Sequence, residues 1–157
     1  NEGEGFTVLL LLIFKVLHIA CVAVWWGVPM SMPRDIRRTI ALGPPHGDAL
    51  VVRVNRVRII AMVSGLASIA TGLTLLFTLG GFGAVPKVIH VSLGLALVLL
   101  CSEYALEGRI WKRIVTCIES DEANLDIGRD VRRMSYVAGF HHGLWVVILV
   151  LMVFRHY

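Results

Sequence analysis

The chain has 157 residues, of which 57% are hydrophobic, and its mean hydropathy is +0.77. The length indicates one domain. The high share of hydrophobic residues excludes an ordinary soluble domain. The net charge of +4 does not indicate nucleic acid as a partner. The arginines lie beside apolar segments, where we interpret them as topology signals and as contacts to anionic lipids of the bilayer.

Four apolar segments are long enough to cross a bilayer core of roughly 30 Å, which takes about 20 helical residues. Pro29 and Pro33 are expected to end the first helix, and a glycine-rich turn follows the second. After the third segment, basic and apolar residues alternate in a pattern that suits a helical extension reaching into or lying along the interface. We predict an all-α, integral membrane, up-and-down four-helix bundle, a single transmembrane domain over 1–157. Its helices are expected at about 6–30, 57–79, 86–106 (with the interfacial extension to 118) and 134–154.

Lysine and arginine are distributed unevenly between the two sides of this bundle. The stretch 34–58 holds six arginines, and the stretch 109–133 holds six lysines and arginines. The opposite side has only Lys87 and Arg155. By the positive-inside rule, the two basic stretches face the cytoplasm. The sequence therefore predicts a multi-pass protein of the inner (cytoplasmic) membrane, with both termini on the non-cytoplasmic side.

Three of the four predicted spans carry histidine, and an ionisable residue within a span needs a reason. At a rise of about 1.5 Å per residue, His18 lies roughly 18 Å from the outer start of its span. His142 and His141 lie roughly 20 and 21 Å from the outer end of theirs. Because these spans run in opposite directions, the histidines are expected at one level. Two imidazoles so placed suit a single haem b iron.

The identity of the second ligand is open at this point. His141 and His142 point about 100° apart, so only one of them faces a given iron. We favour His142, because the small residues Ala138 and Gly139 precede it and leave space for a porphyrin. His141 is the alternative ligand, and a second haem is a further alternative. His90 lies near the outer start of the third span, so it is a poorer partner for His18. Any single membrane histidine has a simpler explanation, which is a hydrogen bond between two helices.

Other residues near the predicted level complete the expected cofactor site. Trp25 and Trp145 share the helix faces of the histidines and could stack on a porphyrin, although ordinary core packing explains them as well. Ser68 belongs to a stripe of small residues that suits either a bulky ligand or close helix packing. Lys15 lies one turn outward of His18, where it could contact a haem propionate or a quinone headgroup, or extend to the lipid headgroups.

The first helix resembles a known family. It contains Lys15-Val-Leu-His18, then Trp25, Gly27 and Pro33-Arg34. This is similar to the K-x-L-H…W…G…P-R pattern of the HemJ-type protoporphyrinogen oxidases and the related CopD-like membrane proteins. The resemblance continues through Arg56-Val-Arg58-Ile59, Gly72-Leu73 and Lys87, and it covers about the first 100 residues. It implies a four-helix bundle that binds haem b with His18 as an axial ligand. The fourth helix departs, with His141-His142 and without that family's N-E-x-P motif.

Taken together, these features predict a b-type cytochrome-like membrane protein that exchanges electrons with quinone or with a partner redox complex. A second histidine ligand would close the iron to substrate, which suits a relay. One alternative is an enzyme of the HemJ type. Another is a non-catalytic accessory subunit of a respiratory or photosynthetic membrane complex.

Overall fold

The computed structural model describes residues 2–43, 46–120 and 127–154, and these residues form helices and short turns without any strand. Part of the predicted basic loop (44–45), most of the polar loop before the fourth helix (121–126) and Arg155 lie outside the described residues. The elements in chain order are α1 (Glu2–Gly27), the 3₁₀ turn η1 (Val28–Ser31), α2 (Met32–Ala41), α3 (Gly47–Thr78), α4 (Lys87–Ser102), the π-helical turn η3 (Glu103–Glu107), α5 (Gly108–Glu119) and α6 (Ile127–Val153).

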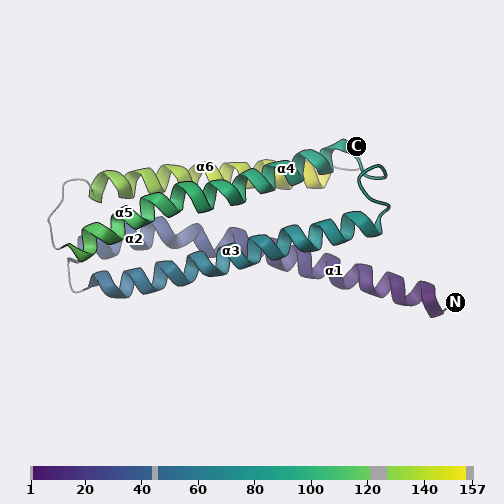
Figure 1. The fold of residues 1–157 in the computed structure, drawn as a ribbon, viewed down its shortest axis with the longest axis horizontal. Coiled ribbons are helices and arrows are strands. Elements are labelled where there is room, and N and C mark those ends of the chain that lie inside the picture. Colours follow the sequence, from purple (N-terminus) through teal and green to yellow (C-terminus); the bar gives the residue numbers. More distant parts are fainter. Residues whose placement is uncertain (1, 44–45, 121–126, 155–157) are drawn as a thin grey trace.

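The predicted all-α bundle of four membrane-spanning helices is confirmed. Gly5–Ala41, Gly47–Thr78, Lys87–Glu119 and Ile127–Val153 are each long and apolar enough to cross a bilayer. They run up and down along one axis, with both termini and the α3–α4 connection at one end, here called the termini end (Figure 1). The helices α2 and α5 end, and α3 and α6 begin, at the other end, here called the loop end.

The helices extend further toward the loop end than hydropathy predicted. α3 begins at Gly47 and α6 at Ile127, so most of the predicted basic loops is helical. Pro29 and Pro33 interrupt the first helix without ending the span, because η1 and α2 follow α1 directly. These extensions escape a hydropathy count because their outer faces are charged, while their inner faces are apolar.

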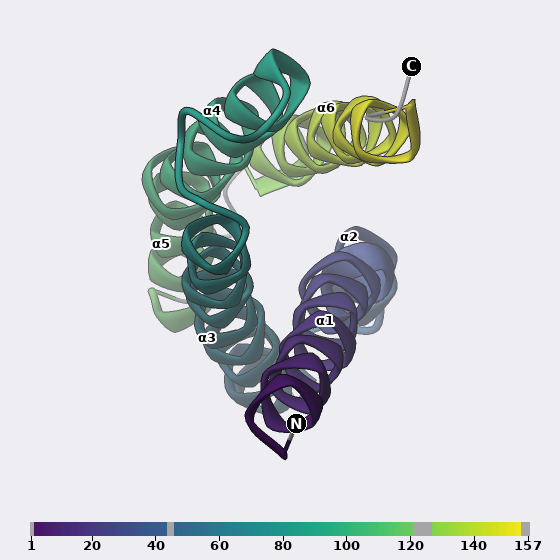
Figure 2. The ribbon, with the colours of Figure 1, turned by 90° about the vertical axis from the view of Figure 1, so that its right-hand side faces the viewer.

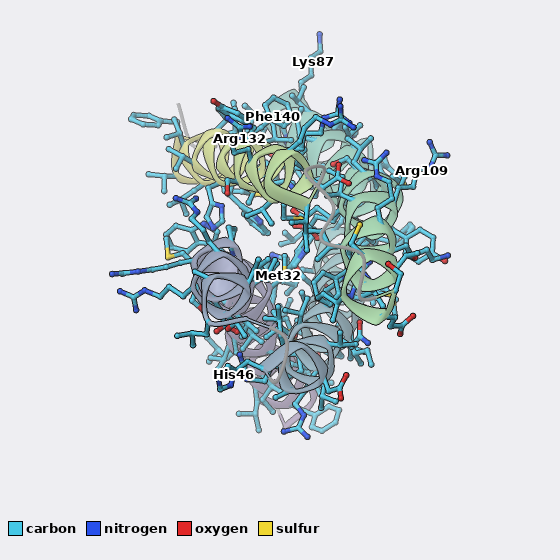
Figure 3. All side chains as sticks on the ribbon, turned by 90° about the vertical axis from the view of Figure 1, so that its left-hand side faces the viewer. Met32, His46, Lys87, Arg109, Arg132 and Phe140 are labelled. Carbon is cyan, nitrogen blue, oxygen red and sulfur yellow. The ribbon has the colours of Figure 1, made fainter. Side chains whose placement is uncertain are left out.

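The apolar faces of the extensions form a closed core at the loop end. Met32, Ile36, Leu50, Trp111 and Met134 are all at most 3% exposed and belong to one cluster. Apolar residues of the predicted interfacial stretch 106–118, namely Ile110, Trp111 and Ile114, belong to this core, because α5 packs on α6. Viewed from the loop end, Met32 lies inside the bundle and Arg109 points away from it (Figure 3).

One irregularity interrupts the third span. Its buried positions include Ser92, Leu99, Glu107 and Ile114, and the steps between them are seven, eight and seven residues. A regular α-helix keeps one face with steps of about seven, so an eighth residue would rotate the face. The π-helical turn η3 absorbs the additional residue. As a result a glutamate, Glu107, faces the bundle where the regular step would place Leu106, which is 47% exposed.

The termini end is more open. Seen from that end, the helices lie on an arc in which α1 packs on α3 and α4 packs on α6, while α1 and α6 diverge (Figure 2). A smaller core holds the middle of the bundle together, where Trp25 and Trp145 meet edge to face with ring centroids 4.7 Å apart. Beyond this tryptophan pair, the space between the spans is a cavity.

Candidate functional site

The cavity toward the termini end has a volume of about 460 Å³, within the usual range for small-molecule sites. It is called the outer cavity below. All four spans contribute to its wall, which is almost wholly apolar. Four residues predicted from the sequence, His18, Trp25, Ser68 and Trp145, line it together. The sequence therefore located several parts of one site on three different helices.

His18 is held in a defined orientation at the wall of this cavity. Its Nδ1 donates a hydrogen bond to the carbonyl oxygen of Ser68 at 3.0 Å and lies 3.1 Å from Thr71 Oγ1. A carbonyl oxygen only accepts, so Nδ1 carries the proton and the neutral ring keeps a lone pair on Nε2. The ring lies against Gly72, where an added Cβ would be 3.1 Å from His18 Cε1. The imidazole is therefore held in place through Nδ1. Metal-ligating histidines are commonly held in the same way, by the nitrogen that does not bind the metal.

The predicted level match between His18 and the fourth-helix histidines does not agree with the structure. The Trp25–Trp145 contact aligns α1 with α6. His18 lies seven residues toward the termini end from Trp25, whereas His142 lies three residues toward the loop end from Trp145. At about 1.5 Å per residue, His18 and His142 are roughly 15 Å apart along the bundle, too far to ligate a single iron.

The error comes from the reference points used to estimate depth. The prediction counted residues inward from the first and last apolar positions of the two spans. In the structure α1 extends beyond the other helices at the termini end (Figure 1), so equal counts do not mean equal levels.

The two fourth-helix histidines have different surroundings. His141 is 3% exposed and uses both ring nitrogens, with Glu107 Oε1 2.9 Å from Nδ1 and Ser102 Oγ 2.8 Å from Nε2. His142 donates from Nδ1 to the carbonyl oxygen of Ala138, and its Nε2 is buried without a hydrogen-bond partner. His142 is thus the one of the pair with a free ring nitrogen, but neither histidine lines the outer cavity.

Two further predicted residues lie away from the cavity wall. Lys15 is exposed on α1, and His90 on α4 has its ring 5.6 Å from that of Phe82. His90 Nδ1 lies 3.3 Å from the carbonyl oxygen of Pro86 in the preceding turn. Neither residue is among those that line the outer cavity, so His18 is its one histidine among the described residues.

A second pocket, which the sequence did not predict, lies between α3 and the π-helical turn. It is called the inner pocket below and has a volume of about 300 Å³. Its wall contains Arg58, Glu103 and Glu107. Glu103 Oε2 accepts a hydrogen bond from Trp25 Nε1 at 2.7 Å, so the indole that lines the outer cavity also contacts the wall of the inner pocket. The signal in the sequence is a pair of glutamates four residues apart beside an apolar span.

The comparisons with known protein families, curated proteins and solved structures find no match for this chain. Within 2–43, 46–120 and 127–154, no group of three or more His, Cys, Asp or Glu side chains is placed to hold a bare metal ion.

Proposed function

We propose that the protein is a haem-b-binding membrane protein that transfers electrons, with the cofactor in the outer cavity and His18 as an axial ligand. The observation that carries the proposal is the state of His18. Its Nδ1 is engaged by the Ser68 carbonyl, which leaves the Nε2 lone pair for a metal at the wall of the cavity.

The wall of the cavity supports a flat apolar ligand. Trp25, Trp26 and Trp145 supply aromatic surface, and Gly72 lets the His18 ring lie close against α3 at the cavity wall. A haem held here would supply one-electron chemistry, while the chain's own residues orient it and exclude water.

A second candidate function is supported by the single histidine of the cavity. With no other described histidine on the wall, a haem bound to His18 would take no second histidine ligand from this cavity. This favours an enzyme of the HemJ type over a relay with two histidine ligands. Complementation of a strain that lacks protoporphyrinogen oxidase separates the two, because growth requires the enzyme and a relay does not restore it.

The deciding experiment is a reduced-minus-oxidised spectrum of the purified protein. We expect the α-band of haem b in the wild type and in His142→Ala, and its loss in His18→Ala. His90→Ala is the matched control, because this histidine lies on the same half of the bundle but off the cavity wall. A wild-type protein without the α-band would refute haem binding. Co-purification of haem-free protein with a large complex would instead favour the accessory-subunit role.

The sidedness of the chain follows from its charges. We propose that the basic loop end faces the cytoplasm and that the electron partner is quinone or a larger redox complex. Labelling of Asp48→Cys by an impermeant thiol reagent, in a background where Cys21, Cys101 and Cys117 are serine, is expected only when the cytoplasmic face is accessible. Labelling from the non-cytoplasmic face would reverse the orientation.

A further inference from the structure

The inner pocket has an unusual set of charges for the interior of a membrane bundle. Arg58, which is partly buried, brings a positive charge to its wall, and Glu103 and Glu107 bring two carboxylates. Among the described residues, Arg58 makes no hydrogen bond or ion pair shorter than 4 Å, and its guanidinium lies against Gly108. Ionisable side chains are costly within a membrane span and usually mark a path for a substrate, an ion or a proton.

The carboxylates connect to further polar groups. Glu107 is 8% exposed and pairs with His141, whose other ring nitrogen lies beside Ser102. Glu103 uses only Oε2 for its bond to Trp25, so that its Oε1 has no partner among the residues described. The inner pocket thus presents acceptor oxygens that no described residue engages, Glu103 Oε1 and Glu107 Oε2, and unengaged donors from Arg58.

The pocket is open toward lipid. Ile59, Met62 and Tyr104 belong to its wall and are 58%, 39% and 73% exposed. In a helix bundle that spans a membrane, such exposed apolar residues face the acyl chains. A ligand with a long apolar tail can therefore place its head in the pocket while the tail remains in the bilayer.

These features point to a ligand with both accepting and donating oxygens and with an apolar ring. A phosphate headgroup would bring further negative charge beside two carboxylates, which disfavours it. We infer that the inner pocket binds the headgroup of a quinol, with Glu103 Oε1 accepting from one hydroxyl and Arg58 donating to the opposite oxygen. The inference deepens the proposed function, since it assigns a place to the quinone exchange, but binding itself does not require haem.

The arrangement also accounts for the protons of quinol oxidation. Conversion of one quinol to quinone breaks two O–H bonds and releases two protons and two electrons. The protons have two acceptors in the cluster, the Glu103 carboxylate and the Glu107–His141 pair. The two electrons need two equivalents of a one-electron acceptor, and a haem held at His18 would supply such one-electron chemistry under the proposed function.

The ionisable groups that face this cluster come from three elements. They are Arg58 on α3, Tyr104 with the two glutamates on η3, and His141 on α6. The contributions of α1 and η1 are Trp25 and Pro29, which do not titrate. Arg109, the first basic residue after Glu107 in the chain, points away from the bundle and does not face the cluster (Figure 3).

The test is an anaerobic titration of the purified full chain in detergent with a short-chain benzoquinone and with its quinol, followed by tryptophan fluorescence. We expect saturable quenching, because Trp25 borders the pocket. Arg58→Gln should weaken binding of both forms about tenfold or more, as expected for loss of a charged hydrogen-bond donor. Glu103→Gln should weaken binding of the quinol more than binding of the quinone, since a neutral amide oxygen accepts the hydrogen bond of the hydroxyl less strongly than a carboxylate does.

The matched controls carry the same changes at exposed positions. Arg109→Gln and Glu119→Gln should leave both affinities unchanged. Thermal denaturation of each variant separates loss of binding from loss of fold. Unsaturable quenching in the wild type, or equal affinities in Arg58→Gln and Arg109→Gln, would overturn the inference.

The outcome is distinguishable from a failure of the proposed function. A protein without haem that still binds quinone in an Arg58-dependent manner retains the site and loses the electron-transfer role. A protein that shows the haem α-band but no saturable quinone binding retains the proposed cofactor and refutes this pocket as its quinone site.

Discussion

At the loop end, α2, α3, α5 and α6 enclose a core of fully buried side chains, whereas at the termini end α1 and α6 diverge around a cavity. The two ends differ in what drives the helices together. The loop-end helices have charged outer faces, which suit water or lipid headgroups, and there burial of apolar surface favours closure. Apolar helices within lipid gain little from hiding one apolar side chain behind another.

The contacts at the two ends follow this difference. At the termini end, α1 is held to α3 by particular polar contacts, such as the hydrogen bond from His18, and by the close approach of the two helices at Gly65 and Gly72. The closed end therefore fixes the bundle, and the open end is free to accommodate a ligand.

The largest effect is expected from emptying the closed core. Trp111 is 2% exposed at the loop end and donates from Nε1 to Asn55 Oδ1 at 2.8 Å. Trp111→Ala should lower the free energy of unfolding by about 3–5 kcal/mol, the usual range for a buried aromatic. Trp26→Ala, on the cavity wall and 38% exposed, is the matched change and should cost well under half of that. Equal losses in denaturant unfolding would contradict the distinction between the ends.

An intermediate effect is expected at the helix contact of the open end. Gly72→Ala would place a methyl group 3.1 Å from the His18 ring, displacing the imidazole from the Ser68 carbonyl. We expect a loss of about 1–3 kcal/mol from overpacking, together with weaker binding of the proposed haem. Gly94→Ala is the control, because nothing lies within 4 Å of its added methyl group, and helix propensity should make it neutral or stabilising. If both variants were equally stable and equally able to bind haem, the contact would have no role in the site.

The smallest effect is expected from a surface ion pair of the closed end. Arg53 and Asp35 approach to 3.2 Å, but their side chains are 49% and 40% exposed. Arg53→Gln should change the free energy of unfolding by less than about 1 kcal/mol. The same measurement on Asp130→Asn, whose side chain is 7% exposed and pairs with Arg113 at 3.2 Å, should give the larger loss. The reverse order would indicate that surface charge holds this end.

Hydropathy and helix length were sufficient to predict four spans, because a membrane allows few other structures for apolar segments of about 20 residues. Helical periodicity placed His18, Ser68 and Trp145 on the inward faces of regular helices, and in the structure the three residues line one cavity. The relative positions of residues on different helices, measured along the bundle axis, could not be predicted in this way. They depend on how far α1 extends beyond its neighbours, and only a contact such as Trp25–Trp145 fixes them.

The inner pocket escaped prediction for a different reason. A regular helix through the third span would turn Leu106 toward the bundle and Glu107 away from it, which is the arrangement that local rules favour. The π-helical turn reverses this choice, and it becomes recognisable only from the eight-residue step between Leu99 and Glu107. Arg58 is interpreted from the sequence as part of the basic stretch 34–58, and nothing in the sequence pairs it with Glu103 across the two helices.

The additional residue in the third span also has a consequence for inheritance. Loss of a single codon, for example that of the exposed Ala105, would shorten the step from Leu99 to Glu107 to seven residues, so that a regular helix would still turn the glutamate toward His141. Such a lesion leaves the reading frame intact and removes the π-helical turn while the buried glutamate keeps its inward position, so it is expected to yield a folded protein.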